Sequence, residues 1–330
     1  MAGDEATQDQ LDRLAAAALA SYDLSPSSTV SLINVSENWT FRVDDPETGR
    51  RAALRLHRPG YHDAAEIESE LTWLEALRDE GVIETPRILR TRSGERVVGV
   101  SLDELATTRN VVLFDWVEGA APTAEDVPSF QRLGAVSARM HQHARTWRRP
   151  PSFTRFTWDY ETTLGPRGHW GRWQSGLGMT PDALATLGRL DETIRRRLER
   201  FGTGSDRFGL THADLRIANL IVDADRTIVI DFDDCGLAWF MYDWATAVSF
   251  MEDHPSVPEL QDAWVEGYRG VAPLSADDEA ELPTFVMLRR LLLTAWIGSH
   301  HTFATEAAEL GAGFTEGTCA LAEAYLSTVS

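Results

Sequence analysis

One stretch, residues 212–234 with the sequence HADLRIANLIVDADRTIVIDFDD, constrains the fold of this chain more than any other. Two apolar runs, Leu220–Val222 and Thr227–Ile230, flank a short polar segment that contains Asp223 and Asp225. Apolar runs separated by a few turn-forming residues are typical of a β-hairpin. The sequence therefore predicts a hairpin in which Asp223 and Asp225 are turn residues.

Polar residues flank this hairpin at both ends. We place its midpoint at residue 225, which sets Asn219 opposite Asp231 across the two strands. An amide oxygen and a carboxylate then meet at one spot, and Mg²⁺ needs few protein oxygens because water and phosphates complete its octahedron. Asp214 precedes Asn219 with the spacing D-x-x-x-x-N, and a D-F strand end follows. This is the spacing of a kinase catalytic loop and its metal-binding aspartate, so Asp214 is the candidate base.

The full pattern, H-x-D-x-x-x-x-N followed by I-D-F-D-D, resembles the aminoglycoside phosphotransferase and choline kinase superfamily. With Gly236 and the pair Tyr242 and Asp243, it is most similar to the branch that contains the bacterial stress response kinase and homoserine kinases. The resemblance implies an α+β, bilobal, protein-kinase-like fold. Its small N-terminal lobe, an antiparallel sheet that binds nucleotide, would span residues 1–118. A larger, mainly helical lobe that carries catalysis and substrate binding would span residues 119–330.

The same resemblance implies a role for each polar residue of the hairpin region. Asp214 would face a substrate hydroxyl as the catalytic residue, while Asn219 and Asp231 would hold Mg²⁺ between the phosphates of ATP. Asp233 would contact a second metal ion or the substrate. ATP and Mg²⁺ are thus the expected cofactors.

Other polar residues near the motif are expected to support it. His212 would brace the catalytic loop by hydrogen bonding. Asp243 would stabilise the same loop through Arg216. His141, on an apolar face of a helix predicted over Val127–Ala144, is expected to be a core residue, because a histidine in that setting is more often buried and hydrogen-bonded than a ligand.

The N-terminal region alternates short apolar runs with polar turns, which predicts an antiparallel sheet after an amphipathic helix over residues 5–20. The expected strands are Val30–Val35, Thr40–Val43 and Ala52–Leu56. The loop between the first two strands has no glycine, so the glycine-rich kinase loop is missing. Ser36 and Asn38 in this loop are candidate phosphate contacts, and a plain β-turn is an equally good interpretation.

Kinases carry a phosphate-binding lysine on the third strand, paired with a glutamate of the following helix. All 31 basic residues of this chain are arginine, and Arg55 occupies that place on the strand. In a helix predicted over Asp63–Glu80, Glu70 falls within the apolar stripe. A buried carboxylate is costly unless it is paired, so the sequence predicts an Arg55–Glu70 ion pair that serves nucleotide binding.

A further apolar strand, Asn110–Phe114, leads into the expected crossing between the lobes. The resemblance to the kinase-like family implies that the backbone of Asp115 and Val117 contacts adenine there. Residues 145–180 are irregular and rich in tryptophan, and they either line the substrate cleft or pack as an insertion. Apolar periodicity then predicts three helices that would wall the acceptor site: Glu259–Tyr268, Asp277–Ile297 and Ala304–Leu326.

Composition limits the partners of the chain. The 330 residues carry a net charge of −20, from 51 acidic and 31 basic side chains. Such a surface repels nucleic acid and anionic membranes and attracts a cationic small molecule. The N-terminus lacks the basic and apolar parts of a signal peptide, and the longest apolar stretch is too short to span a bilayer, which predicts a cytoplasmic location. Oligomeric state stays open.

Three functions are compatible with these residues. The first is a kinase that transfers the γ-phosphate of Mg·ATP to a hydroxyl of a small amine-bearing molecule, such as an aminoglycoside, an amino alcohol or a hydroxy amino acid. The second is a protein Ser/Thr kinase of the stress-response type. The third is a nucleotide-binding regulator without catalysis, suggested by Arg55 and by the loop without glycine.

Overall fold

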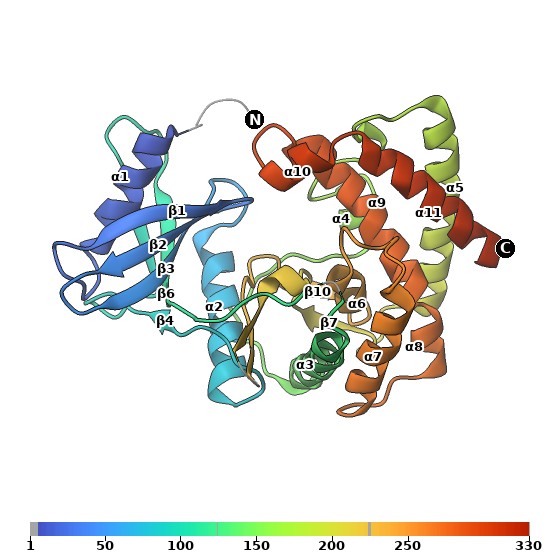
Figure 1. Cartoon of the computed structure of the whole chain (residues 1–330), viewed down its shortest axis with the longest axis horizontal. Helices are drawn as coiled ribbons and strands as arrows, with labels where there is room; N and C mark the ends of the chain where they lie inside the picture. The colour runs from blue at the N-terminus through green and yellow to red at the C-terminus, as the bar shows by residue number, and fades with distance from the viewer. Residues whose placement is uncertain (1–5, 124, 224–225, 330) are drawn as a thin grey trace. The chain divides into compact units, whose positions relative to one another are not determined.

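The computed structural model describes residues 6–123, 125–223 and 226–329. The chain forms two compact units (Figure 1). Unit 1 comprises residues 1–79, 85–118 and 150–154, and unit 2 comprises residues 80–84, 119–149 and 155–330. Unit 1 contains the large antiparallel sheet and unit 2 contains most of the helices, so the predicted α+β class is confirmed.

Unit 1 is a six-stranded antiparallel sheet in the order β1-β2-β3-β6-β4, with β5 also paired to β6. Its elements are α1 (Gln8–Leu19), β1 (Thr29–Val35), β2 (Trp39–Asp45), β3 (Arg50–Leu56), α2 (Ala64–Asp79), β4 (Ile88–Leu89), β5 (Val97–Val100) and β6 (Arg109–Asp115). The four strands and two helices expected in this region are all present. The short strands β4 and β5 were not predicted.

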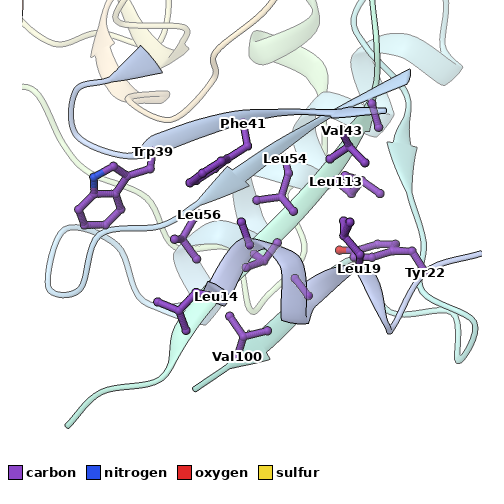
Figure 2. Close-up of a cluster of buried hydrophobic side chains, with 14 of the residues drawn as sticks. Leu14, Leu19, Tyr22, Trp39, Phe41, Val43, Leu54, Leu56, Val100 and Leu113 are labelled. Atoms are coloured by element: carbon purple, nitrogen blue, oxygen red, sulfur yellow. The ribbon is translucent and has the colours of Figure 1, made fainter. Parts of the chain in front are cut away.

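Helix α1 covers one face of this sheet. It starts at a capping box in which the Thr7 side chain accepts from the backbone of Gln10, and its three leucines turn inward together with Ala15 and Ala18. Leu54 and Leu56 of β3 join them in the core that Figure 2 shows. Successive side chains of a strand point to opposite faces, so Arg55 between these leucines points away from α1.

Unit 2 is mainly helical and holds two small antiparallel ribbons, β7 with β10 and β8 with β9. Its elements are α3 (Val127–Thr146), α4 (Tyr160–Thr163), the 3₁₀ turn η1 (Trp173–Ser175), α5 (Pro181–Phe201), β7 (Phe208–Thr211), the 3₁₀ turn η2 (Ile217–Asn219), β8 (Leu220–Asp223), β9 (Arg226–Val229), β10 (Gly236–Trp239), α6 (Tyr242–Ala247), α7 (Val257–Arg269), α8 (Ala276–Ala280), α9 (Leu282–His300), α10 (Thr305–Leu310) and α11 (Gly313–Val329).

Helices α3 and α7 pack at very short range. A β-carbon on Gly134 would lie 1.9 Å from the carbonyl oxygen of Trp264, and one on Gly267 would lie 1.8 Å from that of Gln131. The two backbones therefore approach so closely that only glycine fits at these positions. This contact fixes α3, which carries His141, against α7, which carries Tyr268.

Each of the three C-terminal helices was predicted as a single helix, but two of them are divided into two helices in the structure. The segment expected as Asp277–Ile297 divides between α8 and α9, with Pro283 in the first turn of α9, where its missing N–H has no intrahelical partner to lose. The segment expected as Ala304–Leu326 divides at Gly311, whose φ of 54° ends α10. The apolar periodicity continues through both breaks, so a prediction based on periodicity could not detect them.

The insertion at 145–180 packs by its aromatic side chains. Trp158, Trp170 and Trp173 are all buried. The Trp173 indole and the Tyr160 hydroxyl both donate to the carboxylate of Asp191 on α5, at 3.0 and 2.8 Å. These tryptophans therefore anchor the insertion, as the packing interpretation expected. Among the described residues, no helix is long and apolar enough to cross a membrane.

Candidate active site

The hairpin predicted around residue 225 is present as β8 and β9, but its register differs by one residue. Leu220 pairs with Val229, so Asn219 lies opposite Ile230 and accepts a 3.0 Å bond from its N–H. The prediction that Asn219 faces Asp231 is wrong, because the midpoint falls between residues 224 and 225. Asp223 ends β8, and the other predicted turn residue, Asp225, lies outside the described residues.

Asp214 stands at the centre of a hydrogen-bonded loop that joins β7 to η2. One carboxylate oxygen, Oδ2, accepts from the Asn219 amide at 2.9 Å, and the same amide nitrogen donates to the Asp214 carbonyl at 2.9 Å. Its side chain is 16% exposed. The amide nitrogen of Asn219 is thus committed to the loop, which leaves the amide oxygen to act as a ligand for a hard cation.

His212 braces this loop as predicted. Its Nδ1 accepts from the Asp214 N–H at 3.3 Å, so its Nε2 donates to the carbonyl of Ile230 at 3.1 Å. Its ring packs on the buried ring of Phe232, with centroids 4.4 Å apart. The histidine therefore ties the catalytic loop to the end of the hairpin.

Asp243 stabilises the catalytic loop, but it does so without Arg216. Its Oδ1 accepts from the Ala213 N–H at 3.0 Å, where Ala213 holds a left-handed φ of 62°. Its Oδ2 accepts from Nε2 of His141 at 2.9 Å, and the Tyr268 hydroxyl donates to Nδ1 of that ring at 3.1 Å. Burial lowers the pKa of His141, which favours the neutral ring, and its two hydrogen-bond partners set the tautomer.

The expected link from Arg216 to Asp243 is wrong because Arg216 forms a different ion pair. Its two Nη atoms donate to the two oxygens of Glu306 on α10, at 2.7 and 3.0 Å. Burial lowers the pKa of Arg216. The negative charges of Asp214 and Glu306 raise it by more, so the pKa lies above its ordinary value. A permanent positive charge therefore lies beside the candidate base.

Two of the predicted metal ligands, Asp231 and Asp233, lie in the segment directly after β9. Asp231 is exposed and adopts a left-handed φ of 61°, which turns the chain sharply after the hairpin. Asp233 is 5% exposed, and its carbonyl accepts from Nη2 of Arg155. Arg155 also donates to the Cys235 carbonyl at 2.7 Å, and the Trp158 indole donates to that of Asp234 at 2.8 Å. The insertion thus holds the backbone of residues 233–235.

Arg289 is a part of the site that the sequence interpretation missed. It lies on α9, is 2% exposed, and its Nη2 donates to Oδ1 of Asp214 at 2.6 Å. The signal was present in the sequence, since Arg289 and Arg290 interrupt an otherwise apolar run and a buried guanidinium requires a partner. Nothing local identified Asp214 as that partner.

In unit 1 the predicted ion pair is confirmed. Nη2 of Arg55 donates to Oε1 of Glu70 at 2.5 Å, with 8% and 0% of the two side chains exposed. The Arg55 guanidinium also lies over the ring of Phe114, 5.4 Å from its centroid. The role of this pair in nucleotide binding stays a prediction.

Three of the other predicted nucleotide contacts of unit 1, Ser36, Asn38 and Asp115, make local bonds. The Asn38 side chain accepts from the Arg58 N–H at 3.0 Å, and Ser36 donates its N–H to the Asn38 carbonyl at 3.0 Å. The Asp115 N–H donates to the Arg87 carbonyl at 2.8 Å. Arg50 pairs with the Asp115 carboxylate at 3.0 Å, and Val117, two residues on, is half-buried. Their roles in binding nucleotide stay predictions.

Comparison with known proteins identifies the family of the chain. Residues 29–281 match the phosphotransferase enzyme family, and the chain belongs to that family. A microcompartment-associated aminopropanol kinase of known structure is 47% identical, with a TM-score of 0.88, over 96% of this chain and 98% of that one. An uncharacterized protein of Deinococcus radiodurans is 30% identical over 295 residues, 87% of this chain and 82% of its own length.

A third relative has the same fold at lower identity. The structure of the amicoumacin kinase hAmiN, in complex with AMP-PNP, Ca²⁺ and amicoumacin, is 22% identical with a TM-score of 0.75, over 95% of this chain and 93% of that one. The predicted superfamily and the kinase-like fold are therefore confirmed, and the chain is a kinase. A regulator without catalysis is no longer favoured.

Proposed function

We propose that this kinase transfers the γ-phosphate of ATP to the hydroxyl of a small amino alcohol. The observation that carries the proposal is the partly exposed carboxylate of Asp214, held between Asn219 and Arg289 in a chain that is 47% identical to an aminopropanol kinase. The net charge of −20 favours a cationic acceptor over an anionic one. The amicoumacin kinase structure that holds AMP-PNP supports ATP as donor.

Asp214 orients the acceptor hydroxyl and receives its proton as the oxygen attacks phosphorus. Each carboxylate oxygen has two lone-pair positions, and Oδ1 and Oδ2 each accept one bond from Arg289 or Asn219. One position on each oxygen is thus open to an acceptor hydroxyl. The 16% exposure of the side chain gives that hydroxyl access.

Mg²⁺ bound with ATP would neutralise the charge that develops on the transferred group. The residues fit this ion, because the Asn219 amide is oriented by two bonds from its nitrogen and Asp231 offers an exposed carboxylate. Both supply the oxygen ligands that Mg²⁺ prefers. Asp233 is a further candidate ligand, and Arg55 of unit 1 would contact the nucleotide phosphates.

The test measures ADP release with Mg·ATP and a panel of acceptors. The panel contains aminopropanol, ethanolamine, homoserine, an aminoglycoside and a protein substrate. Propane-1,2-diol is the matched control, because it has the three-carbon skeleton of aminopropanol with a second hydroxyl in place of the ammonium group. Turnover with amino alcohols, absent for the diol and absent in Asp214→Asn, supports the proposal. Turnover with the protein alone would instead identify a protein kinase.

A further inference from the structure

We propose that Arg289 is a positioning residue that fixes the carboxylate of Asp214 in its working orientation. The proposal deepens the proposed function, because it takes Asp214 as the base. Arg289 comes from α9, far along the chain from the catalytic loop. Arg289 therefore connects helix α9 of unit 2 to the carboxylate of Asp214.

The guanidinium of Arg289 is held on three sides. Nη2 donates to Oδ1 of Asp214 at 2.6 Å, Nη1 donates to the Tyr242 hydroxyl at 3.1 Å, and Nε donates to the Ser249 hydroxyl at 3.1 Å. Its central carbon lies 5.2 Å from the ring centroid of Trp170, which belongs to the insertion. A planar fork with three fixed donors has one orientation, and Lys has no equivalent fork.

The two bonds to Asp214 fix the plane of its carboxylate. The terminal torsion of an aspartate is broad, so a single bond leaves the group able to rotate. Here Arg289 holds Oδ1 and Asn219 holds Oδ2, from different elements of the fold. Rotation would break one bond or the other. The open lone pairs of the carboxylate therefore face one direction, which is the condition for efficient proton transfer.

Arg289 does not itself exchange a proton. Burial lowers the pKa of Arg289. Tyr242 and Asp214 raise it by more, so the pKa lies above its ordinary value. Burial also raises the pKa of Tyr242, so its hydroxyl stays protonated and accepts from Arg289 without competing for the acceptor proton. The arginine thus acts through the position of Asp214 alone.

The adjacent Arg290 provides a matched control. It is also buried, with 5% exposure, and its Nη1 donates to Glu252 at 2.6 Å while its Nε donates to Thr318 at 3.0 Å. Neither partner belongs to the catalytic loop. Arg290→Lys therefore reproduces the loss of a buried guanidinium on the same helix without touching Asp214.

The experiment compares Arg289→Lys with Arg290→Lys in steady-state kinetics. We expect kcat of Arg289→Lys to fall by about 100-fold with KM for Mg·ATP unchanged, because misplacing a reacting group by about 1 Å costs that much. Arg290→Lys should keep the wild-type kcat wherever thermal melts show it folded. A wild-type kcat in Arg289→Lys, or an equal loss in both variants, would overturn the proposal.

Two further measurements separate positioning from folding. If Arg289→Lys does not fold, Tyr242→Phe and Ser249→Ala each remove one support of the guanidinium and keep its charge, so each should lower kcat and leave KM unchanged. Unchanged kcat in both would overturn the proposal. In a folded Arg289→Lys, addition of Asp214→Asn should make the two losses non-additive, since both act through one carboxylate. Full additivity would contradict the proposal.

The activity of Asp214→Asn distinguishes a failure of the base assignment from a failure of the positioning role of Arg289. If the wild type turns over no amino alcohol, the proposed function fails. If the wild type and Asp214→Asn are equally active, the assignment of Asp214 as base fails, and the positioning role of Arg289 fails with it. If Asp214→Asn is inactive while Arg289→Lys and Arg290→Lys are both fully active, the base assignment stands and the positioning role alone fails.

Discussion

Asp243→Ala should lower both the stability of the chain and its activity, because it removes a buried brace of the catalytic loop. The Asp243 carboxylate accepts from the Ala213 N–H at 3.0 Å and from His141 Nε2 at 2.9 Å, and all three residues are fully buried. Alanine leaves both donors without that acceptor. A buried donor that loses its partner costs about 1–3 kcal/mol, so the variant should lose roughly 2–6 kcal/mol of unfolding free energy.

The loss is large against the stability of a typical domain, which is about 5–15 kcal/mol. It also releases Ala213 from its left-handed φ of 62°, a conformation that persists only where surrounding bonds enforce it. We therefore expect kcat to fall even at temperatures where the variant is folded. Urea denaturation gives the free energy, and ADP release on the folded variant gives kcat.

Asp243→Asn is the control for this experiment. Its side-chain oxygen can still accept from Ala213, and its amide can donate to His141 if that ring changes tautomer. We expect it to keep more stability and more activity than Asp243→Ala. The bracing argument is refuted if Asp243→Ala unfolds at the wild-type urea concentration and turns over at the wild-type rate.

Three more predictions concern stability. Glu70→Ala should cost about 3–5 kcal/mol in urea denaturation, because it removes the carboxylate beside the buried guanidinium of Arg55. Gly267→Ala should cost about 1–3 kcal/mol through overpacking, because its new carbon would lie 1.8 Å from a backbone oxygen. Because the pKa of His141 is lowered in the folded chain, this histidine is protonated at a higher pH in the unfolded chain than in the folded one. Stability should therefore decline below the ordinary histidine pKa of about 6.5, by up to about 1.4 kcal/mol per pH unit, as pH-dependent urea denaturation would measure.

Each of these predictions has a control on the same chain. Glu68→Ala, on the same helix as Glu70, removes a carboxylate that is 40% exposed and should cost less than about 1 kcal/mol. Gly188→Ala has open space around it on α5 and should be neutral or stabilising by about 0.5–1 kcal/mol. His141→Gln should flatten the acid decline. An equal loss in Glu68→Ala or Gly188→Ala, or an unchanged acid slope, would contradict the corresponding argument.

The Arg55–Glu70 contact could be predicted because strand alternation and helix periodicity each placed a charged residue at a buried position. Arg55 alternates with core leucines on β3, and Glu70 lies in the apolar stripe of α2, so each needed a partner and the other was available. His141 and His212 were correctly assigned structural roles, because an apolar helix face and a loop end leave few alternatives. The motif around Asp214 was legible because its spacing is local.

The errors arose where the answer depends on a single residue or on distant contacts. The hairpin register is decided by one position in the turn, and an error of one residue moved the partner of Asn219 from Asp231 to Ile230. Helix α9 is apolar on nearly every face, so periodicity could not indicate which way Arg289 points. Its partner on the catalytic loop is set by tertiary packing, which a single sequence does not reveal.

The most direct test of the account follows phosphorus through the reaction. ³¹P NMR of Mg·ATP with an amino alcohol would be recorded with the wild-type chain and with Asp214→Asn. The account predicts that the wild type converts the γ-phosphate into an O-phosphorylated amino alcohol, while Asp214→Asn still binds Mg·ATP and forms none of it. Formation of that ester at the wild-type rate by Asp214→Asn would contradict the account.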